Sequence, residues 1–262
     1  MDEVFYNDIA GSLQFSRSVT NSETDYGVDR AVSDTIKSTC RSTGTGDWHI
    51  TFNGSGANNI KGIIICGLNT GTWTTLQAQG DDADFAGAPA ATSNFTVKTR
   101  TLYRYDAASR MVVSAPRYDA YIKETWGYQD YRIKFNSAAV SYYDIGRVYI
   151  FTGNNVCTRN PNAGAPGGIM TTCNIVSGEG GQLISTPKYQ QFIYDMNFSR
   201  TDRTEIDWIE KILPLNPSLI WAVDGLTSGQ LIFGKVTTGL PSTIGLTFGD
   251  DANINVKLTE AL

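Results

Sequence analysis

Two runs of residues between positions 131 and 153 constrain the fold of this chain more than any other feature. In residues 131–136, Tyr, Ile and Phe alternate with Arg, Lys and Asn, which is the period of a strand that buries one face. In residues 148–151, Val, Tyr, Ile and Phe follow one another, so both faces of the second strand carry bulky apolar side chains. Such a strand is central in its sheet or covered by another part of the chain. The polar, irregular residues 136–144 predict a connection rather than a helix.

Short strands separated by turns rich in Gly and Asn are predicted throughout the first 150 residues. No segment of this half has the period of an amphipathic helix. The pattern predicts a mainly β protein, a jelly-roll β-sandwich over residues 13–153. The other strands expected here lie at residues 13–17, 48–52, 60–66, 72–78, 95–105, 111–114 and 118–123.

A change of composition begins after Gly153. Residues 154–168 are rich in Gly, Pro and Asn, and we interpret them as a loop or linker that marks a domain boundary. Residues 169–262 then predict a small α+β module with one helix. Asp202 and Glu205 form a capping-box pattern at the start of this helix, and Pro214 ends it. The strands of this module are expected at residues 174–176, 182–185, 188–198, 218–223, 230–236, 242–248 and 253–259.

Residues 1–12 are predicted to be an irregular N-terminal arm. Val4, Phe5 and Tyr6 form an apolar cluster with the period of neither a strand nor a helix. An exposed cluster of this kind is a liability in a monomer, and contact with a neighbouring chain would remove it from water. We therefore expect these three residues to make assembly contacts, and we expect a chain without residues 1–10 to remain folded.

Composition and charge restrict the class of protein. The chain of 262 residues is 41% hydrophobic and 18% charged, which suits a folded core. Its net charge of −5 and its scattered Lys and Arg residues argue against nucleic acid as a partner. The sequence offers neither a secretory signal pattern nor an apolar run long enough for a membrane helix. We expect a protein made in a cytoplasm, with no membrane insertion.

No catalytic or cofactor motif is apparent in the sequence. Its four cysteines lack metal-binding spacing, and Cys157 and Cys173 are either free thiols, as we prefer, or a disulfide in an oxidising compartment. The sequence has one histidine, His49, and no G-x-S-x-G motif whose serine it could activate as a general base. We therefore interpret His49 as a hydrogen-bonded structural residue. Gly178, Gly180 and Gly181 lack the context of a phosphate loop. We expect neither an enzyme nor a cofactor.

Two groups of side chains are candidates for ligand binding, each with a plainer interpretation. Asp81, Asp82 and Asp84 could contribute to a Ca²⁺ loop, although a solvated acidic turn is the preferred interpretation. A second group of aromatic residues could form a platform on which sugars stack, although core or inter-subunit packing is preferred. This group consists of Trp73, Trp126 and Tyr128, with Tyr131 beside them.

Three stretches together resemble the discoidin-like, galactose-binding-like jelly roll of tailed-bacteriophage virion structural proteins. They are IGRVYIFTG at residues 145–153, the loop and strand at 36–53, and the hairpin at 60–80. The sequence departs from the pattern at Cys40 and Asn53, where a large aromatic residue and an acid are expected. The resemblance implies a structural protein of the tail or baseplate. It also implies that a structural Ca²⁺ and a glycan are ligands known for this fold.

The sequence therefore predicts a structural component of a tailed-phage virion, most simply in the tail or its distal end. Its partners would be other copies of itself, as a homo-oligomer, and other virion proteins, and its location would be the virion. The alternative is a carbohydrate-binding adhesion module for host-surface glycans on the same fold, because a fold does not determine a function.

Overall fold

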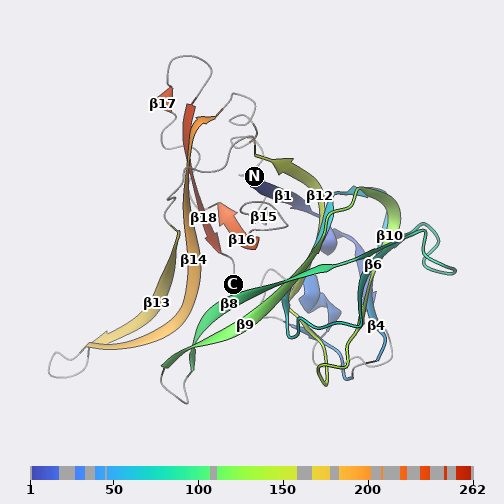
Figure 1. Ribbon diagram of the computed structural model, residues 1–262, viewed down its shortest axis with the longest axis horizontal. Coiled ribbons are helices and arrows are strands. Elements are labelled where there is room, and N and C mark those ends of the chain that lie inside the picture. The colour runs from blue at the N-terminus through green and yellow to red at the C-terminus, as the bar shows by residue number, and fades with distance from the viewer. Residues whose placement is uncertain are drawn as a thin grey trace.

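The computed structural model describes residues 2–17, 27–32, 39–44, 46–106, 111–157, 167–177, 183–201, 208, 219–222, 231–236, 245–246 and 252–260. The protein is built mainly of β-strands, as its sequence predicts (Figure 1). The elements of the first half are β1 (Glu3–Asp8), η1 (Ala10–Ser12), β2 (Gln14–Arg17), η2 (Val28–Val32), β3 (Cys40–Arg41), β4 (Trp48–Ile60), β5 (Gly62–Leu68), β6 (Thr75–Asp81), β7 (Ala91–Asn94), β8 (Thr96–Asp106), β9 (Met111–Ile122), β10 (Trp126–Asn136), β11 (Asp144–Ile145) and β12 (Arg147–Val156).

The second half of the chain adds further strands. They are β13 (Gly167–Ser177), β14 (Leu183–Thr201), β15 (Leu219–Ala222), β16 (Leu231–Val236), β17 (Gly245–Leu246) and β18 (Ala252–Glu260). Of these, β13 and β14 are the longest described. The helix expected after Asp202 lies almost wholly outside the described residues. Trp208 is described within that stretch, and it is helical. Gly178, Gly180 and Gly181 also lie outside them. Within the described ranges, no helix has the length and apolar character needed to cross a membrane.

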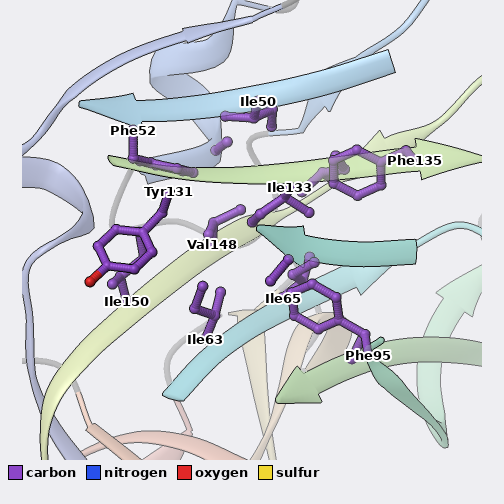
Figure 2. Packing of buried hydrophobic residues seen from close by; sticks show 14 of the residues in the cluster. Ile50, Phe52, Ile63, Ile65, Phe95, Tyr131, Ile133, Phe135, Val148 and Ile150 are labelled. Atoms are coloured by element: carbon purple, nitrogen blue, oxygen red, sulfur yellow. The ribbon is translucent and has the colours of Figure 1, made fainter. Parts of the chain in front are cut away.

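Two sheets pack face to face and enclose the main core. The smaller has the order β2-β4-β10-β6-β7, and the larger runs β13-β14-β18-β16-β15-β1-β12-β5-β9-β8, with β17 paired to β18. Alternate residues of β10, among them Ile133, meet Ile63 and Ile65 of β5 and Val148 of β12 between the sheets (Figure 2). The period-two pattern of β10 therefore marks the face that this strand buries, as the sequence predicts.

The large sheet is buried on both faces at its centre. Val148 and Ile150 of β12 belong to the core between the sheets, whereas Tyr149 and Phe151 belong to a second apolar cluster on the opposite face. The rings of Tyr149 and Phe151 stack with their centroids 5.5 Å apart. This double burial explains why the sequence of β12 has bulky residues at successive positions, and it confirms the prediction of a central or covered strand.

The expected N-terminal arm is instead an interior strand, so that prediction was wrong. Strand β1 pairs antiparallel with β12 on one side and with β15 on the other. Val4 and Phe5 are completely buried, and Tyr6 is half-buried with its ring beside Gly153. Val4 and Phe5 therefore have no exposed surface for an assembly contact. Their lack of period reflects burial on both faces of the sheet rather than an irregular backbone.

The two predicted domains share one sheet. Strand β12 continues to Val156 and β13 begins at Gly167, so the expected linker at 154–168 is shorter than predicted. Residues 158–166 lie outside the described part of the chain. The bridge between the halves is β1, because β15 of the second half pairs with it directly. The indole N–H of Trp221 also donates a hydrogen bond to the Asp2 carboxylate at 2.7 Å, deep in this junction.

Candidate functional site

The outer face of the five-stranded sheet carries polar side chains at the positions between its buried ones. In β10, Tyr131, Ile133 and Phe135 point into the core, so Arg132 and Lys134 point away from it. The same alternation operates in β4 and β6, which flank β10. Six side chains of these strands form what we call the outer-face site: His49, Thr51, Gln77, Gln79, Arg132 and Lys134.

Strand register brings these residues into two rows. Arg132 lies opposite Thr51 of β4 and Gln79 of β6, and Lys134 lies opposite His49 in the next row. The Nε–H of Arg132 donates a hydrogen bond to Oε1 of the buried Gln79 at 2.8 Å. This bond fixes the guanidinium in the middle of the sheet and leaves its two terminal nitrogens available to other acceptors.

An aromatic ring from a separate loop covers the arginine. The guanidinium carbon of Arg132 lies 4.2 Å from the centroid of the Phe85 ring, a cation–π contact. Asp84 and Phe85 both adopt left-handed backbone conformations, with φ of 51° and 56°. Each such residue costs roughly 1–3 kcal/mol and persists only where the surroundings enforce it. Backbone strain of this kind concentrates at binding sites, so the position of Phe85 is a reason to consider this face functional.

Carboxylates of the neighbouring strands hold this loop in place. The backbone N–H of Asp84 donates to Oδ2 of Asp130 at 3.1 Å, and the N–H of Phe85 donates to Oδ2 of Asp81 at 2.9 Å. Asp130 is 1% exposed, and its other oxygen accepts the N–H of Gly54 at 3.3 Å. Because charged acceptors form strong hydrogen bonds with backbone N–H groups, these part-buried contacts offset the strain at residues 84 and 85.

The electrostatics of the outer-face site are positive. Burial lowers the pKa of His49, and the nearby charges of Arg132 and Lys134 lower it further, which favours the neutral imidazole near pH 7. Burial also lowers the pKa of Arg132, against the opposing effect of Asp81, but a guanidinium remains charged at neutral pH. His49 makes no side-chain hydrogen bond with another described residue, contrary to the structural role expected for it.

The acidic residues considered for Ca²⁺ accept hydrogen bonds from the protein, two of them from the backbone. Asp81 accepts the N–H of Phe85, and Asp82 accepts the N–H of Gln129 at 2.8 Å. Asp84 accepts a hydrogen bond from the amide of Asn53 at 2.6 Å. Among the described residues no group of three His, Cys, Asp or Glu side chains is arranged to hold a metal. These carboxylates position the loop that carries Phe85.

The three aromatic residues considered as a glycan platform lie in two separate places. Trp126 and Tyr128 are adjacent, with ring centroids 6.2 Å apart. Trp73 packs on Phe135, at the other end of β10, and its indole N–H donates to the carbonyl of Thr70 at 3.2 Å. Phe135 follows Trp126 by nine steps along β10, which is roughly 30 Å of strand. All three aromatic residues pack against the main core, so they do not form one platform.

Sequence reasoning did not single out Arg132, Lys134 or Phe85. The sequence marks Arg132 and Lys134 only as polar positions of an alternating strand, and no motif marks Phe85. One signal was present, since two basic residues at i and i+2 of a half-buried strand must share its exposed face. The contact between Phe85 and Arg132 joins positions 47 apart in the sequence, and no local pattern indicates it.

Comparisons with known proteins give remote structural likenesses. No protein-family model and no curated protein matches the chain. It is similar to a mutant of the lectin-binding domain of lectinolysin complexed with Lewis b, at 10% identity, 57% coverage of this chain, 99% of that chain and a TM-score of 0.40. A fucose-binding module of Streptococcus pneumoniae is similar at 12% identity, with 56% of this chain and 98% of that chain covered and a TM-score of 0.39. The family 32 carbohydrate-binding module of C. perfringens NanJ, in complex with galactose, is similar at 10% identity, with 59% of this chain and 100% of that chain covered and a TM-score of 0.35.

Proposed function

We propose that this protein binds carbohydrate through the outer-face site. The observation that supports the proposal is the Phe85 ring held over Arg132 by a strained and anchored loop. A sugar presents an apolar C–H face together with hydroxyl groups that donate and accept hydrogen bonds. An aromatic ring suits the first, and guanidinium, amide and imidazole groups suit the second. A few polar groups placed around an apolar surface are typical of small-molecule sites.

The expected affinity is weak for a single sugar unit. The site lies on a sheet face, and a ligand there keeps much of its surface in water. A dissociation constant on the order of 0.1–1 mM corresponds to about 4–5.5 kcal/mol, which one ring contact and two or three hydrogen bonds can supply after ordering costs. Repeated sugar units along the sheet, or several copies of the protein, would raise the apparent affinity by multivalency.

The proposal is tested by screening the purified protein on a glycan array and by titrating the best ligands in a calorimeter. We expect Phe85→Ala and Arg132→Ala each to weaken binding by tenfold or more, because each removes one half of the stacked pair. Tyr142→Ala is the matched control, since the guanidinium of Arg41 lies 4.5 Å from the centroid of the Tyr142 ring on another part of the surface. Equal binding by all four proteins, or no binding to any glycan, would contradict the proposal.

The ends of the large sheet support assembly with other chains as a second candidate function, and a tailed-phage virion is the setting that the sequence resemblance implies for it. Strands β8 and β13 are its two edges, and each has one strand partner among the described residues. The β13–β14 hairpin extends away from the sandwich (Figure 1). An open strand edge can pair with a strand of another chain, which is a common mode of assembly. In this candidate the edge of β13 replaces the N-terminal residues as the contact with neighbouring copies.

A further inference from the structure

The cations of the outer-face site are not neutralised within the described part of the protein. Ion pairs elsewhere in the described part join Arg41 to Asp144, Lys123 to Glu3, and Arg147 to Asp8. Arg132 and Lys134 have no carboxylate within ion-pair distance among the described residues. Arg132 and Lys134 thus place two positive side chains side by side on one face of β10, in a chain whose net charge is −5.

The carboxylates nearest to these cations accept hydrogen bonds from the backbone. Asp81 and Asp130 lie opposite each other at the end of the site, and their oxygens accept backbone N–H groups of the loop that carries Phe85. Asp81 still acts on Arg132 at longer range, because its charge raises the pKa of the guanidinium. The terminal nitrogens of Arg132 nevertheless make no hydrogen bond with the described residues.

Strand geometry places the two cations at a useful spacing. Arg132 and Lys134 are two residues apart on one face of β10, which separates their Cα atoms by about 7 Å. A planar carboxylate can receive two parallel hydrogen bonds from a guanidinium, and an ammonium group beside it adds a second positive charge. The ring of Phe85 lies on the same guanidinium, so a sugar that contacts the ring would bring its substituents to the two cations.

We propose that the ligand of the outer-face site is an acidic carbohydrate, whose carboxylate is bound by Arg132 and Lys134. This inference rests on the proposed carbohydrate-binding function and specifies its ligand class. Phe85 contacts the sugar ring and Arg132 binds the acid, while Lys134 selects for charge. Lys134 therefore adds to the preference for an acidic sugar over its neutral counterpart.

The test compares pairs of ligands that differ in charge alone. The probes are oligogalacturonate and its methyl ester, and sialyllactose and its methyl ester, each titrated by calorimetry or NMR at 50 mM and 300 mM salt. We expect the acidic member of at least one pair to bind at least tenfold more tightly at low salt, which equals about 1.4 kcal/mol. The preference should shrink at high salt, because salt screens exposed charges beyond a Debye length of roughly 6 Å at 300 mM.

Variants separate this inference from the function on which it rests. Lys134→Met should reduce the preference for the acidic member of a pair and the salt dependence of that preference, because one of the two cations is lost while Arg132 still binds the carboxylate. Lys61→Met is the matched control, since Lys61 lies in the turn between β4 and β5 and has no ion pair among the described residues. Equal binding of both members of every pair would overturn the acidic specificity and leave carbohydrate binding intact. Absence of binding to all four sugars and to a glycan array would overturn both.

Discussion

At the scale of single residues, Tyr131 shows how a buried polar group stabilises an irregular part of the sheet. Its side chain is completely buried, and its hydroxyl donates a hydrogen bond to the carbonyl of Asn58. The same hydroxyl accepts the backbone N–H of Tyr128 at 3.1 Å. Between Tyr128 and Asp130 the pairing of β10 with β4 shifts register, so Tyr131 holds the two strands together where their ladder is interrupted.

The titration of Tyr131 gives a testable pH dependence. Burial raises the pKa of Tyr131 from 10.0 to about 12, so the folded protein keeps this proton after the unfolded chain has lost it. The contribution of Tyr131 to the free energy of unfolding is therefore fully present below pH 10 and declines as pH rises from 10 to 12. Urea unfolding of the native protein and of Tyr131→Phe, measured at pH 8, 10 and 11, checks this.

We expect Tyr131→Phe to lower the free energy of unfolding by about 1–2 kcal/mol at pH 8, because two buried groups lose their partner. At pH 11 the difference between the two proteins should be smaller, since only the native protein carries the cost of the protonated phenol. Other tyrosines titrate in both proteins and cancel in the comparison. A difference that stays constant from pH 8 to pH 11 would show that the Tyr131 hydroxyl is not protected as described.

At the scale of elements, β1 connects the two halves of the protein. Glu3, Val4 and Phe5 pair with both β12 and β15, and Phe5 packs on Phe151 with ring centroids 6.0 Å apart. Asp8 at the end of the strand accepts the backbone N–H of Ile150 and pairs with Arg147 at 3.0 Å, both in β12. Removing β1 would expose the facing edges of both partners and part of two apolar surfaces.

We expect deletion of residues 1–8 to abolish cooperative folding, in contrast to the expectation from the sequence. The point variant Phe5→Ala should lower the free energy of unfolding by about 3–5 kcal/mol, because it leaves a cavity at a fully buried position. Gln14→Ala, at an exposed position of the edge strand β2, is the control and should change stability by less than about 0.5 kcal/mol. Circular dichroism and urea unfolding provide the measurements. A truncated chain that unfolds with the same midpoint as the full chain would disprove the role of β1.

At the scale of the whole molecule, the large sheet curls until β14 comes against β8, while the β13 edge stays at the end of the strand order. The part of β14 before Ile193 pairs with β13 alone, whereas the part from Ile193 onward also pairs with β18. The end of the β13–β14 hairpin can therefore be shortened while the pairing of β14 with β18 is kept.

This arrangement gives a test of assembly. We expect the full chain to form oligomers at micromolar concentration and a chain with residues 170–191 replaced by Asn-Gly to remain monomeric, with an unchanged circular dichroism spectrum. Sedimentation velocity measures both, and Asn-Gly is suited to a two-residue hairpin turn. The Lys134→Met variant, which leaves the hairpin intact, is the control. If the full chain and the shortened chain are both monomeric, or both form the same oligomer, assembly through β13 is contradicted.

The sequence by itself determined where many of the strands lie and which of their faces are buried. Alternation at residues 131–136 identified β10, and the continuous apolar run at 148–151 identified a strand covered on both faces. This information is local, because the side chains of a strand alternate with a period of two whatever its neighbours are. The positions of β15, β16 and β18 followed from the same rule. Local pattern was therefore sufficient for a mainly β class.

Only the tertiary structure decided which strands became neighbours, and with them the candidate site. Val4 pairs with Asn155 and Trp221, so nothing near it in the sequence shows that it belongs to the centre of a sheet. Phe85 reaches Arg132 because Asp81 and Asp130 bind the backbone of its loop. Pairing between distant segments depends on the total burial and hydrogen bonding of the folded chain, which no short window of sequence contains.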